Sequence, residues 1–327
     1  MKPRIEAYIA DWGFHQDLTK EQADCLTHVN YSFGHVVDGR VSIDHLEQRP
    51  RLEKLQKDFP HRKVNLSVGG WGADGFSQAV ATAEGRELLA STAISVIREM
   101  DLTGIDWDWE YPASDEAGIA CQPADIQNMS DFLVLMRQKL SALTQETGRY
   151  YEQSIAVGAN HTEDYIWPQV LPALDTVNLM TYDLHMPGMT SHMTGLRANP
   201  GAAFSVEESV AAFHAAGVPK EKMLLGAAFY FHVFEGSQLP QPFAKPYQSK
   251  GGHFPFHALT PDWERRWDEK AQAAYYVKGD TVLSGDEEQS LMLKYRYILD
   301  EGLAGAILWE LNHDPKNVLL PHLAGKA

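Results

Sequence analysis

The sequence contains little cysteine and little positive charge. Its 327 residues include only two cysteines, Cys25 and Cys121, and no Cys-x-x-Cys or Cys/His spacing accompanies them. A disulfide framework and a zinc site are therefore excluded, although a single disulfide between the two stays open. Lysine and arginine number 28 against 44 aspartates and glutamates, which gives a formal net charge of −16. This balance disfavours nucleic acids and anionic membrane surfaces as partners.

Long apolar runs are also missing. No window approaches the roughly 18 consecutive apolar residues of a membrane span, so we expect no membrane insertion. The first residues, MKPRIEAYIADWG, lack the apolar stretch of a signal peptide. No short-period repeat is present, and 44% hydrophobic with 22% charged residues is typical of a folded globular protein.

What the sequence does contain is a regular alternation of short β-rich segments with longer amphipathic ones. The expected strands are residues 4–10, 28–34, 63–70, 104–110, 153–159, 176–182, 222–230 and 305–311. The expected helices include residues 85–100, 125–143, 205–217 and 287–302, the third with a capping-box pattern at Ser205 and Glu208. Eight strands, each mostly followed by a helix, predict an α/β fold of the (β/α)₈ (TIM) barrel type. We expect residues 1–327 to form this single domain.

One segment departs from the alternation. Residues 231 to about 284 are rich in proline, glycine and aromatic residues, and the run is too long for an ordinary loop between a strand and a helix. We expect a small insertion after the seventh strand, on the face of the barrel that carries active sites. Two separate α/β domains would instead need a polar linker near the middle of the chain, and the sequence shows none.

The segment GIDWDWEYP, residues 104–112, places an acid at every second position of a strand that otherwise suits a protein core. Because strand side chains alternate between faces, the acids share one face and the large apolar residues share the other. The acids are Asp106, Asp108 and Glu110. In a barrel the apolar face suits the helices, so the acids point into the interior, with Glu110 nearest the mouth. Carboxylates roughly 6–7 Å apart in a poorly hydrated interior cannot all ionise cheaply, so at least one should have a raised pKa, as a general acid requires.

Two other interpretations of this segment are weaker. Acids at alternate strand positions usually mark a solvated sheet face, but here the opposite face carries two tryptophans and an isoleucine. A calcium loop of the EF-hand kind needs glycine at its sixth residue, where this sequence has Tyr111. The catalytic interpretation is therefore preferred.

At these residues the sequence resembles a known family. TGIDWDWEYP is similar to D-G-x-D-x-D-x-E, the catalytic signature of the family 18 glycoside hydrolases, which are the chitinases and their relatives. LSVGGW (66–71) resembles the S-x-G-G motif of the family's third strand, and LMTYDLH (179–185) resembles the M-x-Y-D of its sixth. HVNYSFG (28–34) and AILWELNHD (306–314) resemble its second and eighth strands. Ordered motifs on so many strands make the resemblance specific and extend it over the whole chain.

The resemblance implies a role for each acid. In this family the substrate's own 2-acetamido oxygen attacks the anomeric carbon, so no second carboxylate acts as nucleophile. Glu110 would protonate the glycosidic oxygen and then act as base towards water. Asp108 would accept a hydrogen bond from the acetamido N–H, with Asp106 below it exchanging a proton or hydrogen bond. Tyr182 would donate its hydroxyl to the acetamido oxygen.

The same resemblance suggests residues that contact the sugar. Asp183 would touch the sugar beside Tyr182, and Trp309 would form the apolar floor under the cleaved sugar. Trp71 is a candidate for stacking on a sugar beyond the cleavage point. The remaining candidates for the substrate-binding site are Tyr230, Met180, Tyr8, Phe33 and Gly70. For Tyr8 and Phe33 we favour a role in lining the core over direct contact with a ligand.

The sequence departs from the family pattern at two places. Thr103 replaces the first aspartate of the signature, and it lies an odd number of residues before Glu110, so it does not share the inward face. After Tyr230 the family often has glycine and arginine, whereas this sequence has Phe231 and His232. The first change leaves the acids intact, and the second removes any sugar contact made by that arginine.

The sequence thus leads us to expect a monomeric, retaining chitinase that needs no cofactor or metal. Its partner would be chitin or a chito-oligosaccharide, a substrate class that favours action outside the cell. An endo-β-N-acetylglucosaminidase acting on glycan cores is an alternative within the same enzyme class. A non-catalytic, chitinase-like lectin on the same barrel is an alternative outside it, and the presence of both Glu110 and Asp108 argues against it.

Overall fold

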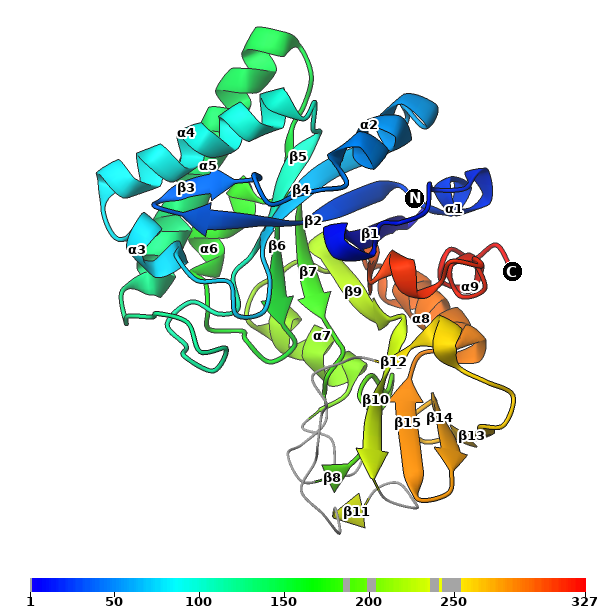
Figure 1. Cartoon of the computed structure of the whole chain (residues 1–327). Helices are drawn as coiled ribbons and strands as arrows, with labels where there is room; N and C mark the ends of the chain where they lie inside the picture. Colours follow the sequence, from blue (N-terminus) through cyan, green and yellow to red (C-terminus); the bar gives the residue numbers. More distant parts are fainter. Residues whose placement is uncertain (1, 185–188, 199–203, 236–240, 243–253) are drawn as a thin grey trace.

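Eight parallel strands close into a barrel in the computed structural model, which describes residues 2–184, 189–198, 204–235, 241–242 and 254–327 (Figure 1). The barrel strands are β1 (Arg4–Ala10), β2 (His28–Val37), β4 (Lys63–Gly69), β5 (Gly104–Asp108), β6 (Glu152–Gly158), β7 (Thr176–Met180), β9 (Met223–Ala228) and β16 (Gly305–Trp309). The first strand pairs in parallel with both β2 and β16, which closes the ring. The predicted (β/α)₈ barrel is confirmed.

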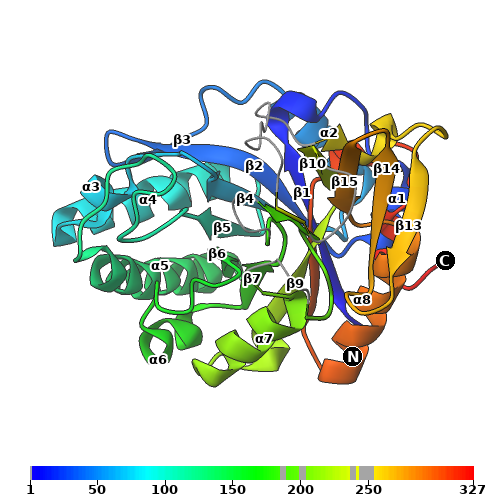
Figure 2. The ribbon, with the colours of Figure 1, turned by 90° about the horizontal axis from the view of Figure 1, so that it is seen from below.

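Helices lie outside the ring of strands, as the view in Figure 2 shows for α4, α5, α7 and α8. The helices are α1 (Lys20–Cys25), α2 (Arg49–Asp58), α3 (Phe76–Val80), α4 (Ala83–Glu99), α5 (Asp125–Thr147), α6 (Trp167–Val170), α7 (Val206–Ala215), α8 (Glu288–Glu301) and α9 (Leu320–Leu323). The predicted capping box is confirmed, because Ser205 and Glu208 each accept a hydrogen bond from the other's backbone N–H at the start of α7. Among the described helices, none is long and apolar enough to cross a membrane. Both cysteines are free, with Cys25 buried and Cys121 exposed, so the disulfide that the sequence left open is not formed.

Strand β5, the fourth of the barrel, separates its side chains between two environments, as the alternation predicts. Trp107 packs edge-on against Phe132 of α5, with ring centroids 4.8 Å apart. Trp109 stacks on Phe76 of α3 at 5.2 Å. Both tryptophans are fully buried in the core between the strands and the helices. This packing fixes the register of the strand, and therefore the direction in which its acids point.

The predicted insertion is a second, antiparallel sheet beyond the tips of β7 and β9 (Figure 1). Its strands are β10 (Tyr230–Glu235), β12 (Phe254–Pro255), β13 (Glu264–Asp268), β14 (Ala273–Lys278) and β15 (Thr281–Gly285). The segment expected as one strand over residues 222–230 therefore divides into β9 and the start of β10. A separate two-stranded sheet is formed by β8 (Met189–Thr190) and β11 (Gln241–Pro242), and β3 (Arg40–Ser42) extends β2. Short 3₁₀ turns cover residues 11–13, 171–173, 220–222, 256–258 and 311–313.

A buried ion pair connects this second sheet to the barrel. Lys294 of α8 places its Nζ 2.6 Å from Oδ2 of Asp286, and both side chains are fully buried. The same carboxylate oxygen accepts a hydrogen bond from the backbone N–H of Ala228 at the end of β9. Because the pair reaches both parts, it fixes where the sheet sits at the mouth of the barrel.

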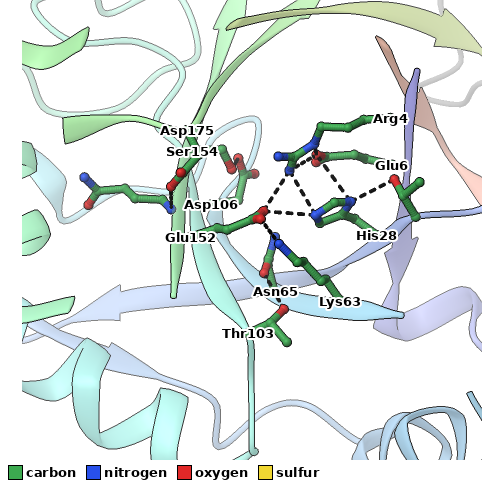
Figure 3. Close-up of polar contacts among 12 residues, drawn as sticks. Arg4, Glu6, His28, Lys63, Asn65, Thr103, Asp106, Glu152, Ser154 and Asp175 are labelled. Atoms are coloured by element: carbon green, nitrogen blue, oxygen red, sulfur yellow. Dashed lines mark hydrogen bonds and ion pairs between the residues drawn. The ribbon is translucent and has the colours of Figure 1, made fainter. Parts of the chain in front are cut away.

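The opposite, N-terminal end of the barrel holds a basal charge cluster, which we define as Arg4, Glu6, His28, Lys63 and Glu152 (Figure 3). Each of these residues lies at or near the start of a barrel strand. Glu152 contacts Nη2 of Arg4 at 2.8 Å, Nε2 of His28 at 2.9 Å, and Nζ of Lys63. Glu6 accepts hydrogen bonds from Arg4. The cluster joins four strands, which is typical of a stabilising role at this end of a barrel.

Thr103, next to this cluster, lies outside the column of acids, as its parity predicts. Its hydroxyl donates to the backbone carbonyl of Val64 at 3.0 Å and lies 3.0 Å from Oδ1 of Asn65 (Figure 3). The residue therefore bridges β5 to β4 where the strands begin. Its place in the motif is structural, because the acids stand further along the strand.

We expect Glu152→Gln to lower the free energy of unfolding by about 3 kcal/mol at pH 7, because it removes a buried carboxylate that pairs with Arg4, His28 and Lys63 together. Although burial alone raises it, the contacts with His28, Arg4 and Lys63 hold the pKa of Glu152 well below its usual range. A depressed folded-state pKa stabilises the fold above the unfolded pKa of about 4.3, and this stabilisation is lost as the pH falls below it. Urea unfolding at pH 7 and pH 3 measures both effects.

The matched control for this variant is Glu146→Gln. Glu146 pairs with Arg98 in an exposed position, where such pairs contribute about 0–1 kcal/mol. A loss below 1 kcal/mol for Glu152→Gln at pH 7 would show that the basal charge cluster does not stabilise the barrel. A loss that stays equal at pH 3 would contradict the assigned direction of the pKa shift.

Candidate active site

A cavity of about 970 Å³ opens at the C-terminal ends of the barrel strands. This is the end at which barrel enzymes place their active sites. The predicted site residues that line it are Glu110, Asp108, Tyr182, Asp183, Trp309, Trp71, Tyr230, Met180, Phe33 and Gly70. Asp106 and Tyr8 do not line it and lie below its floor. Among the described residues, no group of three or more histidine, cysteine, aspartate or glutamate side chains is placed to hold a metal ion.

Asp106 forms the base of the column of acids and is held on all sides. Its Oδ1 accepts hydrogen bonds from Ser154 at 2.7 Å and Asn178 at 3.1 Å. Its Oδ2 accepts from Ser67 and from the Tyr8 hydroxyl, each at 2.8 Å. Complete burial raises the pKa of Asp106 to about 6, although these hydrogen bonds work in the opposite direction. Asp106 is therefore a fixed anchor in the barrel interior, without access to a ligand.

Asp108 stands one step higher and opens on the cavity. Its Oδ1 is buried and has no hydrogen-bond partner among the described residues. Burial, together with the charges of Glu110 and Asp106, raises the pKa of Asp108 well above its usual value. A buried acceptor without a partner is costly, so this oxygen is suited to accept a hydrogen bond from a bound ligand.

Gly69 and Gly70 allow the strand next to the acids to approach closely. A Cβ on Gly69 would lie 2.1 Å from the backbone oxygen of Asp108, and the residue has a φ of +120°. The N–H of Gly70 donates to that same oxygen at 2.8 Å. Position 69 therefore requires glycine, because only a residue without a side chain lets this backbone pack against the backbone of Asp108.

Glu110 is the uppermost acid and has the properties of a general acid and base. It lines the cavity and is 9% exposed. Burial raises the pKa of Glu110 to about 7, a hydrogen bond with Tyr111 lowers it, and the charge of Asp183 raises it again. Because this pKa lies near neutrality, the carboxyl can both donate and accept a proton near pH 7.

A cluster of polar side chains from β10 and from the segment after β7 lies in the cavity wall beside Glu110. Tyr230 of β10 donates its hydroxyl to both oxygens of Asp183, at 2.8 Å each. Nε2 of His232 lies 2.9 Å from Oδ1 of the same carboxylate. The ring of Tyr182 meets that of Tyr230 edge-on at 6.1 Å. His232 thus occupies the position where the family often has arginine, and it contacts Asp183.

Trp309 at the end of β16 provides an aromatic floor. Phe33 stacks on it with ring centroids 5.4 Å apart and an angle of 19°. The ring of Tyr8 approaches it at 6.0 Å, but Tyr8 is only 2% exposed and does not reach the cavity. This placement agrees with the preference for a core role for Tyr8, whereas Phe33, favoured as core, lies in the lining. Trp71 at the rim is 64% exposed, an unusual state for a residue of this size.

Several residues of the lining were not among the site residues predicted from the sequence. They are Trp12, His35, Tyr111, Glu116, Asn160, His161 and His232. Trp12, Tyr111 and His161 directly follow or lie just beyond the ends of predicted strands. Because barrel sites are built from the loops at these ends, their position was a usable signal.

Comparison with known proteins agrees with the geometry of the site. The profile of the Glycosyl hydrolases family 18 matches residues 4–314. Chitinase A1 of Niallia circulans is 31% identical over 302 residues, which cover 82% of this chain and 43% of that protein. The Endochitinase of Manduca sexta is 23% identical over 363 residues, which cover 96% of this chain and 64% of that protein. The chain thus spans about half the length of these relatives.

A solved structure of a family 18 N-acetylglucosaminidase from Paenibacillus barengoltzii is similar over its whole length. It has a TM-score of 0.91 and 36% identity, and the match covers 99% of this chain and 100% of that one. ChiA74, a chitinase of Bacillus thuringiensis, shares the fold with a TM-score of 0.89, covering 99% of this chain and 70% of that one, at 23% identity. The family profile extends over nearly the whole barrel, and the chain therefore belongs to the glycosyl hydrolases of family 18.

Proposed function

We propose that the protein is a chitinase that hydrolyses β-1,4-linked N-acetylglucosamine chains with retention of configuration, using the substrate's own acetamido group as nucleophile. The observation that carries this proposal is the buried Oδ1 of Asp108, which lacks a partner among the described residues and faces a cavity lined by Glu110 and Trp309. An acetamido N–H is a donor that such an oxygen would accept, and an aromatic floor suits the C–H face of a sugar.

The first step breaks the glycosidic bond. Protonated Glu110 transfers its proton to the glycosidic oxygen as the C1–O bond breaks. The acetamido oxygen forms a bond to C1 from the opposite face and gives a cyclic oxazolinium ion, while the leaving sugar departs as a neutral alcohol. In the second step the Glu110 carboxylate takes a proton from water. The water oxygen bonds to C1 as the bond between C1 and the acetamido oxygen breaks, which restores the acetamido group. Two inversions give net retention.

The other residues orient and stabilise this intermediate. Asp108 accepts the acetamido N–H and offsets the positive charge of the oxazolinium ion, since electrostatic stabilisation in a dry site is strong. Asp106 and Tyr8 lie beneath Asp108, and the hydrogen bond between them holds strand β5 in place. Tyr182 donates its hydroxyl to the acetamido oxygen.

Further residues bind the chain of sugars. Trp309 and Phe33 form the floor under the cleaved sugar, and Met180 and Gly70 shape its sides. Asp183, held by Tyr230, contacts the sugar hydroxyls next to Tyr182. These assignments follow from the cavity lining and from the family resemblance.

A second candidate is an N-acetylglucosaminidase that releases sugars from a chain end or cleaves a glycan core. It is supported by the likeness to the Paenibacillus barengoltzii enzyme, which extends over the full length of that chain. The two candidates share their chemistry and differ in how many sugars they bind and where they cleave.

Incubation of the protein with chitohexaose, chitotetraose and a core N-glycan tests the proposal, with Glu110→Gln as the inactive reference. We expect internal cleavage of the chito-oligosaccharides, and products that appear first as the β-anomer by proton NMR. Release of single N-acetylglucosamine units alone would favour the second candidate. Cleavage of the N-glycan alone would overturn the chitinase assignment, and binding without turnover would make the protein a lectin.

We expect Trp71→Ala to raise KM for chitohexaose about tenfold with little change in kcat, because an exposed indole that stacks on a sugar contributes binding and no chemistry. Such aromatic contacts are worth roughly 0.5–1.5 kcal/mol beyond the area they bury. Steady-state kinetics with chitohexaose and chitotriose measure the effect. An unchanged KM for both substrates would remove Trp71 from the binding site, and since its side chain is largely exposed the variant should remain folded.

A further inference from the structure

A histidine stacks on the residue that follows the catalytic acid. His161, just past the end of β6, lies with its ring centroid 3.8 Å from that of Tyr111 and at an angle of 24°. The strand makes room for this stack with Gly158, where a Cβ would lie 2.4 Å from Cδ2 of His161 and 3.0 Å from Cε1 of Tyr111. Both rings line the cavity. The arrangement is therefore built into the end of the strand.

Each nitrogen of His161 faces a carboxylate. Nδ1 lies 2.9 Å from Oδ2 of Asp164, in the same loop. Nε2 lies 3.2 Å from Oε1 of Glu116, in the loop after β5. Burial lowers the pKa of His161, but the hydrogen bond and charge of Asp164, with the charges of Glu116 and Glu110, raise it overall. Both nitrogens can donate only in the imidazolium, so the geometry favours the charged ring.

Glu110 is surrounded by groups that disfavour its ionised form. Asp108 from its own strand, Asp183 after β7 and Glu116 after β5 are acidic, and each interacts with it. Tyr182 and Tyr230 also interact with it, although burial is the main cause of their own raised pKa. His161 acts in the opposite direction and lowers the pKa of Glu110. A cation here offsets part of the repulsion from the acids.

We propose that His161 is a positioning residue for the catalytic acid, because its imidazolium fixes the ring of Tyr111 and places a positive charge beside Glu110. The inference rests on the proposed function, in which Glu110 must give up a proton in the first step and regain one in the second. If repulsion alone acted, the carboxyl would hold its proton too tightly to serve as a strong acid or to return as a base. The pair of His161 with Glu116 keeps the pKa of Glu110 in the range where the carboxyl can both donate and accept a proton.

The test is the pH dependence of kcat/KM for chitotetraose, measured by separating the products, in wild type, His161→Gln and Glu116→Gln. The alkaline limb reports loss of the proton from Glu110. Removing the cation raises the pKa of Glu110, so in His161→Gln this limb should move up by roughly half to one pH unit. Removing the acid in Glu116→Gln should move it down. His61→Gln, an exposed histidine before β4, is the matched control and should leave it in place.

The shift in opposite directions separates this role from a structural one. A uniform loss of activity at every pH, or a limb within 0.2 unit of wild type in both variants, would overturn the proposal. Proton NMR titration of the wild-type imidazoles adds a readout that needs no substrate and no variant. The His161 ring should titrate above its ordinary pKa of about 6.5, and titration at or below that value would also overturn it. Failure of wild type to cleave chitotetraose would instead overturn the proposed function.

Discussion

Replacing Glu110 with glutamine is expected to lower kcat by about 10⁴-fold, because the amide can neither donate the proton that the leaving sugar needs nor take one from water. The side chains are nearly the same size, and the surroundings of Glu110 favour a neutral group, since burial raises its pKa to about 7. The variant should therefore fold normally and bind chitotetraose at least as tightly as wild type. Single-turnover kinetics and calorimetric titration measure these two properties separately.

The pH dependence of wild type gives a second check on Glu110. Because the acid must be protonated in the free enzyme, kcat/KM should fall as the pH rises through about 7. In Glu110→Gln the residual activity should lose this alkaline limb. Glu163→Gln, an exposed position in the loop after β6, is the matched control and should retain wild-type activity within about twofold. A loss below tenfold in Glu110→Gln would show that another group supplies the proton.

The alternation of side chains along a strand accounts for most of what the sequence predicted correctly. In GIDWDWEYP a period of two placed the tryptophans among the helices and the acids in the interior, and Trp107 and Asp106 lie there fully buried. The eight barrel strands were also predicted from the sequence, because turn residues bound each apolar run. The capping box at Ser205 was readable for a similar reason, since its contacts span only three residues.

Contacts between distant segments were not readable in this way. Tyr8 is a candidate for the site by its strand, but its hydroxyl is used by Asp106, 98 positions later in the chain. His161 meets Glu116 only because two loops converge above the barrel. No short sequence pattern predicts such contacts, because they depend on the length and path of each loop. The division of residues 222–230 between two sheets was missed because an apolar run carries no signal for the point at which it changes partner.

Replacing Asp108 with asparagine is expected to lower kcat by about 10²–10³-fold with a smaller effect on KM, because the variant keeps an oxygen that can accept the acetamido N–H but loses the negative charge that stabilises the oxazolinium ion. The loss should be larger than that of a simple hydrogen bond, since the side chain is buried beside Asp106 and Glu110. It should also change the pH profile. Removing a neighbouring negative charge lowers the pKa of Glu110, so the alkaline limb of kcat/KM should move to lower pH.

Asp106→Asn is the informative comparison for this variant. Asp106 accepts four hydrogen bonds and does not line the cavity. We therefore expect Asp106→Asn to lower kcat less than Asp108→Asn does, and to lower the free energy of unfolding more. Kinetics of both variants on chitotetraose rank them by activity, and urea unfolding ranks them by stability. If Asp106→Asn were the more damaging change for kcat at equal stability, the charge that stabilises the intermediate would lie at Asp106, and Oδ1 of Asp108 would not be the acceptor of the acetamido N–H.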